Sequence, residues 1–156
     1  MAFFLTRFYE PALAFFSKSS RLEIYTDGSS KKGMGSWAFI ISLSGKRLVE
    51  NSGRVPRANN NVMEFRAAIE ALNAIPLNSK ATLFSDSRIV VDAMKCGARP
   101  RAYQTQIDVL RHLNERHAIV WQWIKAHNAN EFNERCDELC TLARRAAAIH
   151  YQTHLS

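Results

Sequence analysis

Four acidic residues stand where a carboxylate is costly unless a cation is nearby. Asp27 and Asp86 each follow a short apolar stretch, and Glu64 and Asp137 each lie in the first turn of a predicted helix. Four acids that converge on one edge of a basic protein repel one another, and a bound cation relieves that repulsion. Because the candidate ligands offer only oxygen, the pattern favours a hard ion, Mg²⁺ or Mn²⁺, over zinc.

Each acid also has a purely structural interpretation. Glu64 could close a capping box with Asn61. Asp86 could be the N-cap of its own helix, and Asp137 could favour the dipole of the last helix from its first turn. Only the four together favour a metal site.

A pair of Mg²⁺ ions held by carboxylates suggests phosphodiester chemistry, since two ions can hold the attacking water and the leaving oxygen on opposite sides of a phosphate. His127 lies on the predicted loop before Asp137. A histidine there could act as a mobile acid–base group. The alternative is a histidine that is merely exposed to solvent.

The composition is that of one basic domain. The 156 residues carry a formal net charge of +7, with a sequence pI of about 9.7. This favours a polyanionic partner, either nucleic acid or an acidic membrane surface, although the excess could simply keep the protein in solution. No apolar run reaches the roughly 18–20 residues of a transmembrane helix, so we expect no membrane span. Cys96, Cys136 and Cys140 predict reduced thiols in an intracellular, cytoplasmic protein.

Hydrophobic periodicity predicts the order βββαβααβα in an α/β domain. The predicted strands are 22–27, 36–42, 46–55, 81–85 and 118–125. The predicted helices are 60–74, 86–95, 103–116 and 133–148. Gly28–Gly35 is expected to form a turn, and Asn60 and Asn61 to cap the first helix. If the first and fourth strands are parallel neighbours, Asp27 and Asp86 emerge at the same edge of the sheet.

Three segments are expected along the chain. Residues 1–20 are an N-terminal extension with six aromatic and two basic residues, suited to packing on the domain or a partner, or to targeting. Residues 21–150 form the domain. Residues 151–156 are a C-terminal tail.

Five short segments, in this order, make the chain similar to the type 1 ribonuclease H family. They are Tyr25–Ser29 (YTDGS), Asn60–Glu64 (NNVME), Ser85–Ser87 (SDS), Trp123–His127 (WIKAH) and Asn133–Leu139 (NERCDEL). Each segment is weak alone, but five in order are specific. The resemblance implies a ribonuclease H-like fold, a mixed five-stranded sheet with three antiparallel strands followed by two parallel ones, flanked by helices.

The resemblance also implies an activity. We expect an endonuclease that hydrolyses the RNA strand of RNA–DNA hybrids with two Mg²⁺ ions, for which Mn²⁺ can substitute, leaving 5′-phosphate and 3′-hydroxyl ends. The implied metal-binding carboxylates are Asp27, Glu64, Asp86 and Asp137. His127 is the implied auxiliary histidine, and Asn60 and Asn61 match asparagines that contact the minor groove, where the ribose 2′-hydroxyl distinguishes RNA from DNA. We expect a monomer.

The chain departs from the family pattern in its substrate-facing residues. Many members carry a basic, Trp-rich protrusion, whereas Met94–Ile107 is short and has no Trp. Arg88 replaces a usual Gln, and Lys31 and Lys32 are expected to contact phosphates. Two alternatives stay open: a nuclease acting on another polynucleotide, such as duplex RNA or a junction, and a non-catalytic nucleic-acid-binding module. The second would be expected to lack at least one carboxylate, and all four are present.

Overall fold

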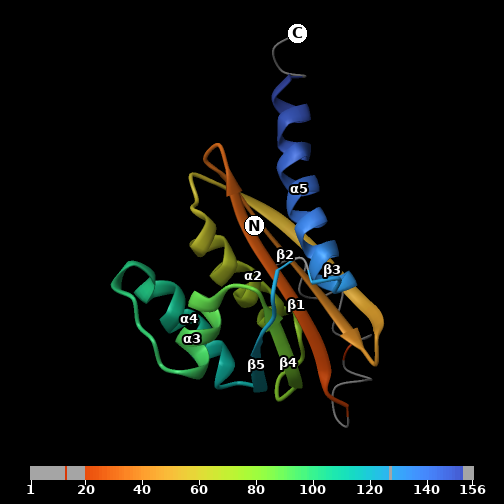
Figure 1. The fold of residues 1–156 in the computed structure, drawn as a ribbon, viewed down its shortest axis with the longest axis vertical. Coiled ribbons are helices and arrows are strands. Elements are labelled where there is room, and N and C mark those ends of the chain that lie inside the picture. Colours follow the sequence, from red (N-terminus) through yellow and green to blue (C-terminus); the bar gives the residue numbers. More distant parts are fainter. Residues whose placement is uncertain (1–12, 14–19, 127, 153–156) are drawn as a thin grey trace.

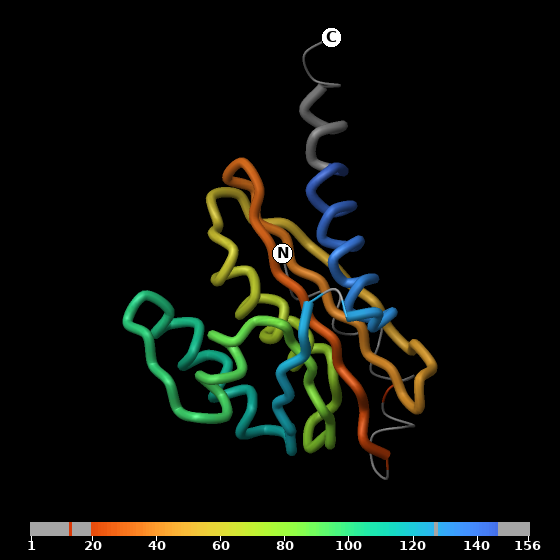
Figure 2. Tube along the Cα trace, viewed as in Figure 1, coloured from red at the N-terminus to blue at the C-terminus, as the bar shows by residue number. Residues whose placement is uncertain are grey.

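Five strands form one mixed sheet in the order β3-β2-β1-β4-β5 (Figure 1). The computed structural model describes residues 13, 20–126 and 128–152, and Figure 2 traces their path. The strands are β1 (Leu22–Lys31), β2 (Met34–Leu43), β3 (Lys46–Pro56), β4 (Lys80–Ser85) and β5 (Ala118–Trp123). The helices are α2 (Asn60–Ala74), α3 (Arg88–Lys95), a 3₁₀ turn η2 (Arg101–Tyr103), α4 (Gln104–Asn114) and α5 (Glu131–Gln152).

The sheet topology confirms the predicted fold class. β1, β2 and β3 pair antiparallel as a meander, and β4 and β5 continue the sheet parallel to β1. The antiparallel strands are joined by short turns, whereas each parallel strand follows a helical crossover, as the geometry of parallel pairing requires. The sheet therefore has an antiparallel half and a parallel half. β1 belongs to both, because it pairs antiparallel with β2 and parallel with β4.

The first hairpin is longer than predicted. Gly28–Gly35 was expected to be a turn, and this is wrong, because β1 continues to Lys31 and β2 begins at Met34. The reversal needs only Lys32 and Gly33, whose φ angles are 51° and 77°. Positive φ at both central residues is the geometry that matches the twist of a two-residue hairpin.

Different helices pack on the two faces of the sheet. Successive strand residues point to opposite sides, so each face contributes its own side chains to a separate cluster. Ile24 and Phe39 belong to the larger core cluster with Phe65 of α2 and Leu110 of α4. Leu13 is fully buried in the same cluster. The opposite face packs against α5, and the cluster there contains Tyr25, Ala38, Ile40, Cys136, Leu139 and Cys140. α5 is thus the helix that covers the face on which Asp27 lies.

α2 begins one residue after its cap. Asn60 and Asn61 were expected to supply the N-cap, but the cap is Asn59, whose side chain accepts a hydrogen bond from Val62 N (2.9 Å). Asn59 has the extended backbone of an N-cap residue. Because capping falls to Asn59, the side chains of Asn60 and Asn61 are left for other contacts.

The boundaries of α3 and α5 also differ from those predicted. α3 begins at Arg88 after Ser87, so Asp86 precedes the helix and does not begin it as predicted. α5 begins at Glu131 instead of residue 133, because Asn130 Oδ1 accepts a hydrogen bond from Asn133 N (3.0 Å) as a cap would. It extends to Gln152, beyond the predicted end at residue 148. In the described part of the chain, no helix is both long and apolar enough to cross a bilayer.

Candidate metal centre

Asp27 and Asp86 lie side by side where the parallel pairing of β1 and β4 ends. The parallel ladder between β1 and β4 ends at the pair Thr26 and Ser85, and the two aspartates are the next residues on each strand. Asp27 lies within β1, which continues along β2, and does not end the strand as predicted. The backbone beyond β4 is fixed by two hydrogen bonds, from Ser87 N to Ser85 Oγ (3.1 Å) and from Trp123 Nε1 to Asp86 O (3.0 Å).

Gly28 brings Glu64 to the same place. A Cβ atom at Gly28 would lie 2.2 Å from the backbone of Met63 and Glu64, so only glycine lets the first turn of α2 lie this close to β1. The Gly28 backbone also hydrogen-bonds the Glu64 carboxylate. The residue after Asp27 therefore sets the position of a second acid, which sequence spacing alone could not show.

Asp27, Glu64 and Asp86 form what we call the carboxylate cluster. Each offers one oxygen, and these oxygens all lie within 4.8 Å of one another. Asp27 Oδ2 and Glu64 Oε2 are buried and have no hydrogen-bond partner among the described residues. Buried carboxylate oxygens are costly unless they are paired or bind a metal. The unsatisfied oxygens and the all-oxygen donor set fit a hard divalent cation.

The pKa values of the clustered acids also fit a site for a cation. Burial first, and then the neighbouring charge of Asp86, raise the pKa of Asp27 from 3.8 to about 6. Burial, followed by the charges of Asp27 and Asp86, raises the pKa of Glu64 well above its ordinary value. A cation lowers such pKa values by stabilising the ionised forms. The chain thus holds these acids together at an energetic cost that a metal ion would remove.

Asp137 lies outside the 4.8 Å group. It is exposed on α5, and its charge contributes to the raised pKa of Asp27. α5 is fixed beneath the cluster by two buried thiols, because Cys136 Sγ and Cys140 Sγ each lie 3.5 Å from a backbone oxygen of β1, those of Tyr25 and Asp27. The predicted free thiols are confirmed for all three cysteines, and two of them serve in this packing.

The predicted substrate-facing residues lie at two places. Lys31 and Lys32 are exposed at the tip of the β1–β2 hairpin. In Figure 1 this tip lies beside the chain that enters α2, and Ser30 N donates a hydrogen bond to Asn60 Oδ1 (3.2 Å). Asn61 Nδ2 donates to Tyr103 Oη (2.9 Å). His127 lies outside the described residues.

Arg88 stacks on an aromatic ring next to the cluster. Its guanidinium carbon lies 3.9 Å from the centre of the Trp123 ring, within the range of a cation–π interaction. The same indole donates its N–H to Asp86 O. Trp123 therefore supports both a cluster residue and the residue that departs from the family pattern, a role that sequence reasoning missed.

Arg144 was also missed by sequence reasoning. From α5 it donates to Ser36 Oγ (2.5 Å) and to Ser29 Oγ, and its charge lowers the pKa of Asp27, although burial and acidic neighbours outweigh it. No motif marks this residue. Its proximity to Asp27 depends on α5 crossing β1 and β2, which only the tertiary structure shows.

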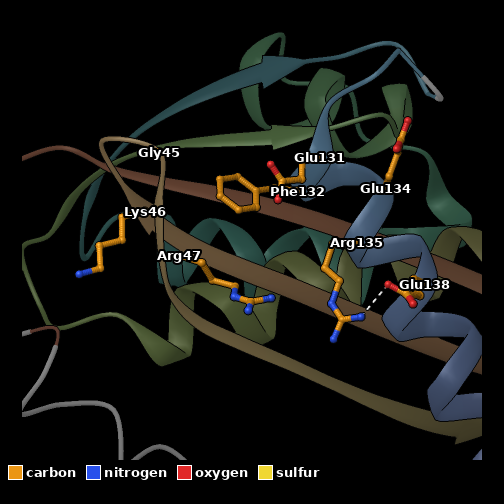
Figure 3. A pocket seen from close by; sticks show the side chains of 8 residues that line it. All are labelled: Gly45, Lys46, Arg47, Glu131, Phe132, Glu134, Arg135 and Glu138. Carbon is orange, nitrogen blue, oxygen red and sulfur yellow. Dashed lines mark hydrogen bonds and ion pairs between the residues drawn. The ribbon is translucent and has the colours of Figure 1, made fainter.

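A second charged group lies elsewhere on α5, and we call it the arginine cluster. Arg135 donates to both carboxylate oxygens of Glu50 (2.9 and 3.2 Å) and to Glu138 (2.6 Å), and Arg47 also contacts Glu50 (2.7 Å). The hydrogen bond from Arg135 is the main reason that the pKa of Glu50 is lowered. Figure 3 shows Arg47, Arg135 and Glu138 of this cluster around a hollow of about 610 Å³ between the β2–β3 turn and α5.

The fold and the carboxylate cluster together place the chain among α/β domains that carry a candidate metal site on a mixed five-stranded sheet. The sequence model of one such group, RNase H, matches residues 19–147. The chain belongs to the RNase H family, type 1, and is an enzyme of that family.

Curated relatives cover most of the chain. A protein named ribonuclease H from Erythrobacter litoralis is 37% identical over 138 residues, which are 79% of this chain and 95% of that protein. One of the same name from Chlorobium phaeovibrioides is 38% identical over 141 residues (80% and 96%). A Synechocystis protein named ribonuclease HI is 34% identical over 143 residues (81% and 89%).

Solved structures agree on the fold. The N-terminal RNase H domain of a Mycobacterium tuberculosis protein superposes with a TM-score of 0.74 at 25% identity, covering 85% of this chain and 99% of that one. A ribonuclease H1 named LC11, solved in complex with an RNA/DNA hybrid, gives a TM-score of 0.71 at 22% identity, with coverage of 82% and 99%.

Proposed function

We propose that this chain is an endonuclease that hydrolyses the RNA strand of RNA–DNA hybrids. One observation carries the proposal: a member of the RNase H family keeps three acids together, two of them with buried oxygens that have no partner among the described residues. A non-catalytic binding module would gain nothing from this costly arrangement. The structure of LC11 in complex with an RNA/DNA hybrid supports the choice of substrate.

The cation we propose is Mg²⁺, with Mn²⁺ able to substitute. Asp27, Glu64 and Asp86 would hold it, and Asp137 would contribute from α5 to a two-ion site. When bound, two such ions activate a water and stabilise the charge on the leaving oxygen, which leaves 5′-phosphate and 3′-hydroxyl ends. The contribution of the chain is to hold these carboxylates in place before substrate arrives, through Gly28 and the point where the parallel pairing of β1 and β4 ends.

Other side chains would bind the hybrid and move protons. Asn60 and Asn61, at the start of α2, would contact the minor groove beside the cluster. Lys31 and Lys32 at the hairpin tip would contact backbone phosphates, which add affinity without reading sequence. His127 would act as the mobile acid–base group. Arg88, whose guanidinium group lies over the Trp123 ring, would present its N–H groups to phosphate oxygens.

We also propose that the enzyme acts as a monomer in the cytoplasm. The proposed location is supported by the cysteines: all three are free, which suits a reducing compartment.

A cleavage assay tests the proposal. Equal amounts of RNA–DNA hybrid, duplex RNA and duplex DNA of one sequence are incubated with the enzyme in Mg²⁺, Mn²⁺ or EDTA, with end-labelled strands to identify the product termini. We expect the RNA strand of the hybrid alone to be cut, only with metal, and 3′-hydroxyl ends to form. Faster cutting of duplex RNA would favour the alternative substrate. Cutting of no substrate, with binding retained, would favour a non-catalytic module.

A further inference from the structure

One end of the molecule carries basic residues and no acids. Three segments meet there: the tip of the β1–β2 hairpin, the end of β3 with the chain that leads into α2, and the second half of α5, which runs past the hairpin in Figure 1. In the sequence they are residues 28–36, 51–63 and 141–152, and none of them contains Asp or Glu. Their six Lys and Arg residues, which we call the hairpin patch, are Lys31, Lys32, Arg54, Arg57, Arg144 and Arg145.

Hydrogen bonds and strand pairing bring these segments together. Gly33 O at the hairpin tip accepts a hydrogen bond from Arg57 N (2.7 Å), which holds the end of β3 against the tip. Ser36 of β2 pairs with Arg54 of β3. Arg144 donates from α5 to Ser36 Oγ (2.5 Å). The patch is therefore one surface built by strands and a helix that are far apart in the sequence.

The positive charge of the hairpin patch is not neutralised by the described part of the chain. None of the six side chains forms an ion pair with a described residue. All except Arg144 are exposed. Arg144 is half-buried, and its hydrogen-bond partners are the hydroxyls of Ser29, Ser36 and Thr141, which carry no charge. Cations gathered without counter-charges favour a polyanionic partner.

The hairpin patch continues from the carboxylate cluster along β1. Asp27, Ser29 and Lys31 share one face of the strand, because alternate residues point to the same side. At about 3.4 Å per residue, Lys31 lies about 14 Å along the strand from Asp27. Arg144 lies near Asp27, since its charge lowers the pKa of that carboxyl. A nucleic acid bound at the cluster and extended along β1 would therefore meet the patch within about four nucleotides, at about 3.4 Å each.

We propose that the hairpin patch binds the phosphate backbone of the substrate outside the cut, within about four nucleotides of the carboxylate cluster. This inference rests on the proposed function. It extends the phosphate contact from the two lysines at the tip to the arginines at the end of β3 and on α5. Phosphate contacts carry no sequence information, and phosphates are common to RNA and DNA, so the patch adds affinity without selecting RNA.

The test removes two charges either from the hairpin patch or from the opposite end of the sheet. The patch variant is Arg54→Gln with Arg145→Gln, since both side chains are exposed and form no ion pair within the described residues. The matched control is Lys46→Gln with Lys80→Gln, two exposed residues near the start of β1. Fluorescence anisotropy in EDTA gives the Kd for a hybrid over a series of salt concentrations, and kinetics in Mg²⁺ give kcat and KM.

The salt dependence gives the expected size of the effect. Each phosphate contact contributes about 0.7–0.9 to the slope of log affinity against log salt. We expect the patch variant to flatten this slope by about 1.4–1.8 and to raise Kd roughly 10–100-fold at about 0.1 M salt. Its kcat at saturating substrate should stay within about twofold of wild type, because phosphate contacts position the duplex without touching the reacting atoms. The control variant should keep the slope and the Kd of the wild type.

Substrate length tests where the hairpin patch acts. A short block of ribonucleotides within a DNA strand fixes the place of the cut, and the duplex is extended on one side at a time. An extension of about two base pairs falls short of the patch, and one of about ten base pairs spans it. We expect the longer duplex to bind the wild type more tightly when it is extended on one side only, and the patch variant to lose that gain. Ribose and deoxyribose in the extension should be equivalent.

Three outcomes would overturn the inference. The first is a patch variant that keeps the slope and Kd of the wild type, and the second is a control variant that loses as much as the patch variant. The third is loss of binding to phosphatidylserine vesicles with hybrid binding unchanged, which would assign the patch to a membrane surface. Thermal unfolding checks the fold, and if the patch variant melts early, Arg145→Gln alone gives the same comparison at half the change in slope.

The failure of this inference can be distinguished from the failure of the proposed function. Binding is measured in EDTA, so the result for the hairpin patch does not depend on cleavage. A wild type that binds the hybrid through the patch and cuts nothing in Mg²⁺ contradicts the proposed function alone. A wild type that cuts the hybrid, together with a patch variant of unchanged affinity, contradicts this inference alone.

Discussion

The protein carries two groups of carboxylates that it treats in opposite ways. In the carboxylate cluster, Asp27, Glu64 and Asp86 are held within 4.8 Å, and the pKa values of Asp27 and Glu64 are raised by burial and by one another. In the arginine cluster, Glu50 is bonded to Arg135 and its pKa is lowered. Both groups lie against α5.

The difference separates a structural charge cluster from a site for a cation. In the arginine cluster the protein supplies the positive charge itself, so the group is complete within the chain. In the carboxylate cluster the charge of Arg144 lowers the pKa of Asp27 but is outweighed by burial and the acidic neighbours, and buried oxygens have no partner in the described part of the chain. Glu50 is thus neutralised by side chains of the protein itself, whereas the carboxylate cluster needs a positive charge that a bound cation would supply.

The largest expected effect is on cleavage. Asp86→Asn removes a ligand charge with little change in volume, and we expect kcat to fall by at least about 10³-fold, or several kcal/mol of transition-state stabilisation, with the fold and hybrid binding kept. Glu50→Gln is the matched control, since it removes one carboxylate charge from the arginine cluster, and its kcat should stay within about twofold of wild type. Single-turnover cleavage in Mg²⁺ measures both. Near-normal turnover of Asp86→Asn would show that Asp86 is not a metal ligand of the site.

A smaller loss is expected for His127→Ala. A general acid–base group typically contributes about 10²–10⁴-fold, and a mobile loop histidine that water can partly replace should cost roughly 10–10³-fold in kcat. Metal binding should be unchanged, because the histidine is proposed to move protons and not to hold the ion. Titration of Mg²⁺ by calorimetry, alongside the kinetics, separates the two roles. A loss equal to that of Asp86→Asn would show that its role is larger than proposed.

The third prediction concerns stability without metal. The pKa of Asp27 is raised from 3.8 to about 6 in the fold, so the folded state binds the proton more tightly and stability falls as pH rises through this window. Asp27→Asn should therefore stabilise the protein in EDTA at pH 7.5 by about 1–3 kcal/mol and have almost no effect near pH 4. Urea unfolding at both pH values measures this.

Added Mg²⁺ provides the control. It should raise the unfolding midpoint of the wild type at pH 7.5, since a ligand of the folded state stabilises it, and should raise that of Asp27→Asn less. Equal stabilisation by Asp27→Asn at both pH values would mean that ionisation of the buried Asp27 carboxyl is not what destabilises the metal-free protein.

The smallest effect, with the opposite sign, is expected at the arginine cluster. The pKa of Glu50 is lowered in the fold, so its contribution is present at neutral pH and lost as pH falls through its titration. Glu50→Gln should destabilise the protein at pH 7.5 by less than about 1 kcal/mol, since the partners are partly exposed, and less again at pH 3. The same urea experiments measure it. If Glu50→Gln instead stabilised the protein at pH 7.5, the two clusters would not differ in the sign of their contribution to stability.

The sequence predicted the fold class well because its signals are local. Alternating strands, the apolar stripe of α2 and the turn residues near Gly45 are each set by neighbouring residues. The boundaries that failed depended on competition between similar residues. Three consecutive asparagines could each cap α2, and Asn59 does so because its backbone is the extended one.

The sequence by itself determined which acids are present, and it indicated that Asp27 and Asp86 lie at one edge of the sheet if the first and fourth strands are parallel neighbours, because the pattern of elements restricts strand order and direction. Only the tertiary structure decided how those acids meet. Gly28 admits Glu64 by its lack of a side chain, α5 places Arg144 and Asp137 near Asp27, and Tyr103 reaches Asn61 from another helix. These are contacts between residues far apart in the chain, and the packing that creates them leaves no periodic trace in the sequence.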